Sequence, residues 1–125
     1  MKQILWLFIV FLAAPLGAQE QTELAAEPRS PADMSVEERM SMMSGASKYD
    51  NCIYAQAISR VKDFADIRHT ADFAMSECHG KLIDLEKLIV EMGFGAGYAN
   101  AFSKRIRNRA ARKILPELAI RQSGG

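Results

Sequence analysis

Two cysteines set 26 positions apart constrain the fold of this chain more than any other feature. The midpoint between Cys52 and Cys78 is residue 65, which lies within Asp63-Phe64-Ala65-Asp66, the most turn-like part of the stretch. Two helices folded back on each other at this turn would bring the cysteines level. We therefore predict an all-α fold built on an antiparallel helical hairpin, with a disulfide between Cys52 and Cys78.

The first 18 residues have the three parts of a secretory signal peptide. Lys2 is followed by an uncharged apolar run from Ile4 to Ala14, and then by Pro15-Leu16-Gly17-Ala18, which ends in small residues. A run of about 11 residues is too short to cross a bilayer, which takes roughly 20. We predict cleavage after Ala18 and export, to the periplasm of a Gram-negative bacterium or outside the cell, with no transmembrane segment in the mature chain.

Export determines how the two cysteines are interpreted, because a bridge is the expected state in an oxidising compartment. Residues such as Ser59 and Ala71 would face each other across the hairpin, and small side chains let the two helix axes approach to the distance that a disulfide requires. The pair Cys78-His79 matches no zinc or haem ligand pattern. We predict no metal and no cofactor.

The strongest periodic pattern covers residues 67–92. Apolar side chains recur there at alternating steps of four and three, at Ile67, Ala71, Ala74, Cys78, Leu82, Leu85, Ile89 and Met92. Such a heptad-like seam predicts one long helix with Cys78 on its buried face. Gly80 weakens this helix without shifting its phase, and Gly93 suits the position just beyond its end.

A shorter helix is predicted to precede the turn, over residues 48–62. Ser47 and Asp50 have the spacing of a capping box, and Ala57, Ile58 and Val61 recur at helical steps. The first helix and the 67–92 helix together form the predicted hairpin.

Residues 19–46 are predicted to be a flexible linker, because they are rich in Glu, Ser, Ala and Met and contain two prolines. A short helix over 36–43 is an option within it, since Ser35 and Glu38 also have capping-box spacing. Its residues Val36, Met40 and Met43 would share one apolar face that covers the main domain.

The last predicted helix runs over residues 98–114, where Pro116 should end it, and residues 123–125 should fray. Residues 104–125 carry a net charge of +6, whereas residues 19–103 carry −6. This separation indicates either internal pairing or an anionic partner. If the last helix docks on the second half of the 67–92 helix, Glu91 should lie near Arg105, and Asp84 near Arg112.

From about residue 48 to residue 121 the sequence resembles a loose class of small exported proteins of Gram-negative bacteria. The class combines a signal peptide, a Cys-x25-Cys helical hairpin with Ala-rich, Asp-containing sequence before the second Cys, and a basic last helix. The matching residues are Cys52, Ala71-Asp72-Phe73-Ala74, Cys78, the stretch from Leu82 to Met92, and the basic run from Lys104 to Lys113. The resemblance implies a helical exported protein and implies no particular activity.

The sequence holds no recognisable catalytic group. His69 and Asp72 stand three residues apart, but no nucleophile accompanies them. We predict a protein that is not an enzyme and has no catalytic residues.

Two functions remain. In the first, the chain is a protein-interaction module of the periplasm with an unidentified protein partner. The partner would bind the second half of the 67–92 helix, with an apolar face at Ile83, Leu88 and Val90, or the methionine-rich segment that precedes residue 46. In the alternative, the last helix binds phospholipid, lipopolysaccharide or another polyanion, although its apolar seam is narrow for a membrane-surface helix. The predicted anion or partner contacts are Lys104, Arg105, Arg107, Arg109, Arg112 and Lys113. We predict no nucleic-acid partner, and the sequence leaves the oligomeric state open.

Overall fold

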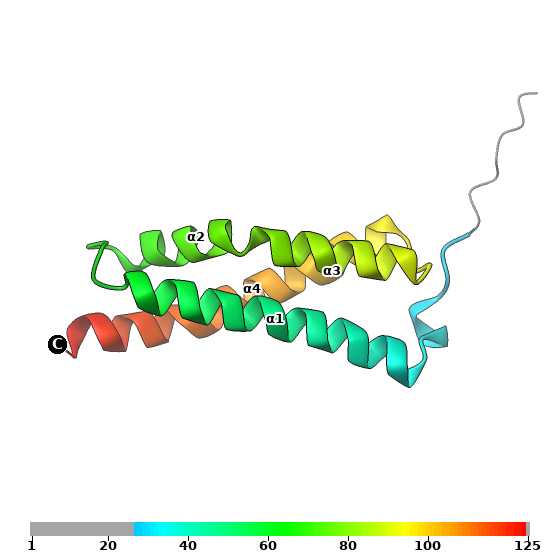
Figure 1. Cartoon of the computed structure of the whole chain (residues 1–125), viewed down its shortest axis with the longest axis horizontal. Coiled ribbons are helices and arrows are strands. Elements are labelled where there is room, and N and C mark those ends of the chain that lie inside the picture. The colour runs from blue at the N-terminus through cyan, green and yellow to red at the C-terminus, as the bar shows by residue number, and fades with distance from the viewer. Residues whose placement is uncertain (1–26, 125) are drawn as a thin grey trace, which may run out of the picture.

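Four α-helices lie side by side along one long axis in the computed structural model, which describes residues 27–124 (Figure 1). They are α1 (Val36–Arg60), α2 (Ile67–Glu77), α3 (His79–Glu91) and α4 (Ala96–Ser123), preceded by a 3-10 turn at Pro31–Asp33. The chain runs along α1, returns through α2 and α3, and reverses again into α4, which contacts all three other helices. This part of the chain contains no strand, so the all-α prediction is confirmed. The predicted signal peptide lies outside the described residues.

The disulfide joins α1 to the junction between α2 and α3. The Cα atoms of Cys52 and Cys78 are 5.9 Å apart and their sulfurs are bonded. The turn between the two arms covers residues 61–66, as the midpoint predicted. Asp66 caps α2 by accepting a hydrogen bond from the backbone N–H of Arg68. The bridged antiparallel hairpin is therefore confirmed.

The first arm of the hairpin is longer than predicted. We expected a flexible linker to residue 46, a separate helix over 36–43 and a new helix at 48, but α1 is continuous from Val36 to Arg60. Ser35 and Glu38 form the capping box at its start, with both reciprocal hydrogen bonds present. Ser47 and Asp50 have the same spacing but lie in the helix interior.

Gly45 explains why the sequence suggested a break in α1. A Cβ atom added at this position would lie 2.8 Å from the Cδ1 atom of Leu85 in α3. The glycine therefore permits a close approach of two helices and does not end one. Its cost in helix propensity, about 1 kcal/mol, is offset by the packing of Leu85, which is fully buried at this contact.

The return arm follows the predicted seam but is divided in two. Every seam residue from Ala71 to Ile89 is buried, which confirms the predicted face. The single helix over 67–92 is wrong, because α2 ends at Glu77 and α3 begins at His79, with Cys78 at φ −94° and ψ 1° between them. The break is at the bridged cysteine and not at Gly80.

The last helix is also longer than predicted. Pro116 lies inside α4, which continues to Ser123 instead of ending at Ile114. Tertiary contacts outweigh the lost backbone hydrogen bond. Leu118 is fully buried, and the side chain of Gln122 donates hydrogen bonds to the backbone carbonyls of Phe64 (2.9 Å) and Ala65 (3.1 Å). Ser123 thus belongs to the helix and not to a frayed tail.

Residues 27–34 are held against the turn between α3 and α4, so this part of the predicted linker is wrong. The backbone N–H of Arg29 donates to the carbonyl of Gly93 at 2.8 Å, and its guanidinium donates to the carbonyl of Met92 at 2.8 Å. The guanidinium also lies 4.6 Å from the ring centroid of the buried Phe94. Gly93 has φ +92°, a conformation that favours glycine.

The core runs the length of the bundle between these helices. Its largest fully buried side chains are Tyr49, Ile53, Leu85, Ile89, Phe94 and Leu118. Full burial of such a side chain contributes roughly 1.5–3 kcal/mol each, which is the main stabilising term for the fold. Within residues 27–124, no helix has both the length and the apolar character to cross a membrane.

Candidate functional site

An exposed apolar stripe lies on the first half of α1. Val36, Met40 and Met43 recur at steps of four and three and therefore share one side of the helix. We define these three residues as the methionine stripe. Their exposed fractions are 68%, 67% and 47%. The expectation that this face covers the main domain is wrong, because the stripe faces solvent, and Met42 is the methionine that enters the core.

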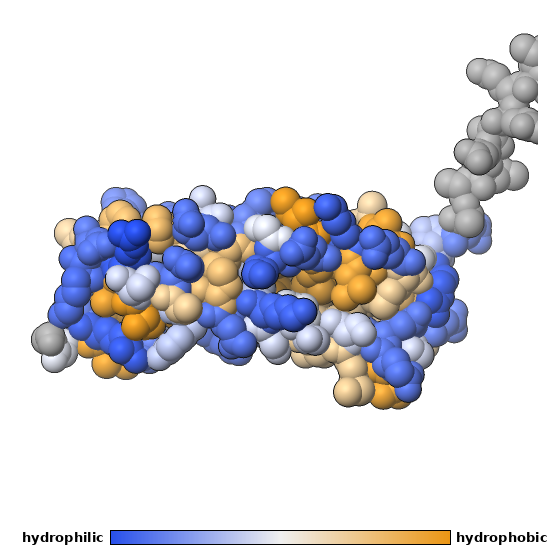
Figure 2. Space-filling model, in the orientation of Figure 1, coloured by the Kyte–Doolittle hydropathy of each residue, from blue (hydrophilic) through white to orange (hydrophobic). Residues whose placement is uncertain are grey.

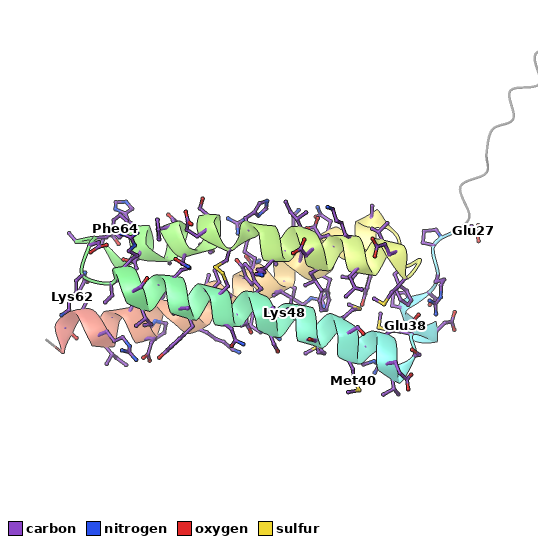
Figure 3. All side chains as sticks on the ribbon, in the orientation of Figure 1. Glu27, Glu38, Met40, Lys48, Lys62 and Phe64 are labelled. Atoms are coloured by element: carbon purple, nitrogen blue, oxygen red, sulfur yellow. A yellow bond between two sulfur atoms is a disulfide. The ribbon has the colours of Figure 1, made fainter. Side chains whose placement is uncertain are left out.

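The stripe adjoins a groove between α1 and α3. Figure 3 shows Met40 projecting away from the bundle, and Figure 2 shows apolar surface at this corner of the molecule. Met40 also borders a hollow of about 520 Å³, whose floor includes Leu85 and Leu88 of α3 and whose rim includes Lys48 and Lys81. The methionine stripe and the groove thus form one continuous surface, which we call the α1–α3 surface.

Ion pairing holds this surface in place at the start of α1. The Arg29 guanidinium donates to both carboxylate oxygens of Glu38, at 2.7 and 3.2 Å. This hydrogen bond, together with the backbone N–H of Ser35, lowers the pKa of Glu38. The first turn of α1 is thereby tied to the turn between α3 and α4, and the methionine stripe is presented on a fixed helix.

The predicted apolar partner face at Ile83, Leu88 and Val90 is not one surface. Leu88 is partly buried and lies in the groove beside α1. Ile83 and Val90, seven residues apart, share a different side of α3 and are 40% and 46% exposed. The structure therefore assigns only Leu88 to the α1–α3 surface.

The basic residues of α4 mostly face solvent, as the sequence suggested. Arg109 is partly buried, and the other five predicted contact residues are exposed. Asp50 of α1 pairs with Arg109 at 3.4 Å and lies 3.8 Å from Lys113. The remaining four, which we call the free basic residues, form no ion pair with a carboxylate of residues 27–124; they are Lys104, Arg105, Arg107 and Arg112.

The predicted register between α3 and α4 is wrong in its ion pairs. Neither Glu91 with Arg105 nor Asp84 with Arg112 is among the ion pairs of the described residues. The polar contact between these helices is a hydrogen bond from the hydroxyl of Ser103 to the carboxylate of Glu86. Docking itself is confirmed, because Ile106 buries against the core and Phe102 packs on it.

Sequence reasoning missed two parts of this arrangement. Asp50 was assigned to a helix cap, and its role as the partner of α4 could not be found because the pairing spans 59 residues. The exposure of Met40 and Met43 was missed because their spacing alone does not say which side of a helix meets the core. The helical spacing of the buried residues could have identified the side that meets the core; these are Met42, Ala46, Tyr49 and Ile53.

The described residues hold no group of three or more His, Cys, Asp or Glu side chains placed to bind a metal ion. No protein-family model, curated protein or solved structure matches the chain.

Proposed function

We propose that this protein is a small exported, non-enzymatic interaction module of the Gram-negative periplasm, and that it binds a protein partner through the α1–α3 surface. The observation that carries the proposal is the exposure of Val36, Met40 and Met43 on a helix whose inner side, which includes Met42 and Ala46, is buried in the core. Contiguous apolar surface of this kind is typical of a binding site. Methionine is favoured at surfaces that adapt to a partner because its side chain is flexible and polarizable.

The chemistry of the surface favours an amphipathic helix with acidic flanking residues as the partner. The methionine stripe spans two helical turns, which is about 10 Å and matches the i, i+3/i+4, i+7 anchors of a partner helix. Lys48 and Lys81 lie at the rim of the groove, against a single carboxylate, Asp84. Acidic side chains beside the partner's apolar stripe would complement the two lysines.

Export is supported by the signal-peptide pattern and by the disulfide, which is typical of oxidising compartments. The resemblance to small exported Gram-negative helical proteins with a Cys-x25-Cys hairpin agrees with this placement. Intact-mass measurement of the exported protein tests it, because the mature chain should begin at Gln19. Retention of residues 1–18 would contradict export by cleavage.

A labelled synthetic peptide tests the binding surface. The probe is a helical peptide with leucines at i, i+3, i+4 and i+7 and glutamates beside them, and its control is a scrambled peptide of the same composition. We expect saturable binding of the patterned peptide, weakened at least about tenfold by Met40→Ser with Met43→Ser. The control is Ile83→Ser with Val90→Ser, which alters two exposed apolar side chains of α3 outside the α1–α3 surface and should leave binding unchanged. Equal binding of the two peptides, or an unaffected methionine variant, would contradict the proposal.

A second candidate function is binding of an anionic surface through the free basic residues of α4. Four cations of α4 have no partner among the described residues, and the intervening exposed positions of the helix carry no large apolar side chain between Lys104 and Arg112. Binding would therefore be electrostatic and weakened by salt. Co-sedimentation with phosphatidylglycerol vesicles should fall at high salt and with Arg105→Gln plus Arg112→Gln. Arg60→Gln plus Arg68→Gln, which removes the same charge from the hairpin, is the control; an equal loss would contradict a site on α4.

A further inference from the structure

The methionines of the described chain differ widely in exposure. Residues 27–124 contain six of them, and Met40 and Met43 are the two that are exposed. Met42 is buried in the core. Three more are partly buried against the core; they are Met34, Met75 and Met92. The most accessible methionines of this part of the chain therefore both belong to the methionine stripe of the α1–α3 surface.

Polar side chains lie beside the two exposed methionines. Ser44 follows Met40 by four residues and Ser47 follows Met43 by four, so each serine lies one turn away on the same side of α1. Both serines line the same surface hollow as the methionine stripe, together with Arg39. A hydroxyl or a guanidinium donates hydrogen bonds, whereas a thioether sulfur accepts them only weakly. An oxygen added to either sulfur would therefore have hydrogen-bond donors next to it on the protein's own surface.

We infer that Met40 and Met43 form a reversible oxidation site that switches off partner binding at the α1–α3 surface. The inference rests on the function proposed for that surface, and hydrogen peroxide is the co-reactant. A lone pair of the methionine sulfur attacks one peroxide oxygen, and the O–O bond breaks. The other oxygen takes the proton of the first and leaves as water. The sulfur loses two electrons, the peroxide gains them, and the product is methionine sulfoxide.

This oxidation changes the binding surface and spares the core. A sulfoxide is polar, and packing it against the apolar side chains of a partner helix removes its hydration without supplying a donor. The donors of Arg39, Ser44 and Ser47 favour the unbound surface. Met42 is 2% exposed, so peroxide reaches its sulfur only when the helix opens. The fold should therefore survive a peroxide treatment that stops binding, and methionine sulfoxide reductases reverse the change.

Peptide mapping of the disulfide-bonded protein after treatment with hydrogen peroxide tests the site itself. Trypsin cleaves after Arg39 and Lys48, so Met40, Met42 and Met43 lie in one peptide, and fragmentation distinguishes them. We expect Met40 and Met43 to be oxidised at least about tenfold faster than Met42, because solvent access controls the reaction. Equal rates at all three would overturn the inference. Oxidation of the exposed pair should leave the melting temperature unchanged, and a clear fall would overturn the switch by showing that oxidation acts through the fold.

Binding of the patterned leucine–glutamate peptide tests the switch. We expect the oxidised protein to bind it at least about tenfold more weakly than the untreated protein, and methionine sulfoxide reductase to restore binding. The matched variant is Met40→Leu with Met43→Leu, which keeps apolar side chains of similar volume and removes both sulfurs. This variant should bind equally well before and after peroxide. Taken through the reductase step, it also controls for any reduction of the disulfide.

The outcomes separate the switch from the function on which it rests. If the untreated protein did not bind the patterned peptide, the proposed function and the switch would both fail. Binding that persists after Met40 and Met43 are oxidised would overturn the switch and leave the proposed function standing. Loss of binding by the peroxide-treated leucine variant would also overturn the switch, because the sensitive group would lie elsewhere.

Discussion

Two faces of α1 carry the same kinds of side chain and meet opposite environments. Met42 is 2% exposed, whereas Met40 and Met43, on either side of it in sequence, are 67% and 47% exposed. The inner face continues through Ala46 and Tyr49 in the core, and the outer face ends after two turns. Composition alone therefore does not assign a methionine to core or surface. The position of the neighbouring helices does, and it separates residues that stabilise the fold from residues free to bind.

Shortening one methionine on each face of α1 should give two different losses of stability. Met42→Ala should lower the free energy of unfolding by about 2–5 kcal/mol, because it leaves a cavity in a packed core. Met40→Ala should change it by less than about 0.5 kcal/mol, because the side chain is already in solvent. Urea unfolding of the two variants measures both. Equal effects would show that the two faces are not distinct.

The disulfide gives the next largest expected effect. A variant with Cys52→Ser and Cys78→Ser should lose about 3.5 kcal/mol, because a closed loop of this length restricts the unfolded chain. The bridge ties α1 to the return arm near the middle of the bundle, so both faces of α1 should remain helical but melt at lower temperature. Thermal melts followed by circular dichroism test this. A variant as stable as the wild type would contradict a stabilising bridge.

α4 also has a side that packs on the core and a side that faces solvent. The expected difference in stability between variants on these two sides is smaller than for α1. Phe102 is partly buried against the core, and Arg105 is exposed and unpaired. Phe102→Ala should cost about 1.5–3 kcal/mol, and Arg105→Ala should lie within about 0.5 kcal/mol of the wild type. If Phe102→Ala left the melt unchanged, docking of α4 through its apolar seam would be wrong.

Acid sensitivity at the cap of α2 is the smallest expected effect. The salt bridge and hydrogen bonds from Arg68 lower the pKa of Asp66 from 3.8 to about 2. Because the folded-state pKa is depressed, the stabilisation is present above about pH 3.8 and is lost as the pH falls towards 2. Asp66→Asn keeps a capping side chain without the charge, so its stability should depend less on pH in this window. Parallel unfolding curves for the two proteins would contradict the assignment.

Features set by local spacing were predictable from the sequence, and features set by distant packing were not. The turn at residues 61–66, the bridge and the seam from Ala71 to Ile89 follow from symmetry and periodicity within one stretch. The continuity of α1 through Gly45 depends on Leu85, and that of α4 through Pro116 depends on contacts with the hairpin turn. Helix propensity favours a break at each of these two positions, and tertiary packing overrides it.

The features of the candidate site that depend on distant packing were likewise not predictable from the sequence. The basic residues of α4 were recognised because residue type alone gives the charge. The contacts of Arg109 and Lys113 with Asp50 were not predicted. The methionine stripe was seen as an apolar face, and its side of the helix was assigned wrongly. Leu88 was grouped with Ile83 and Val90 because all three are apolar, whereas the groove against α1 separates it from them.

Hydrogen exchange of the backbone amides of residues 36–60 tests most directly whether one continuous helix carries both faces. We expect the amides of residues 40–46 to be protected to a similar degree as those of residues 50–57, because both belong to α1 and contact the same core. The methionine stripe would then be exposed on a stable helix. If residues 40–46 exchanged at the rate of an unstructured chain while residues 50–57 stayed protected, the first half of α1 would be the flexible linker that its composition suggested, and one continuous helix would be contradicted.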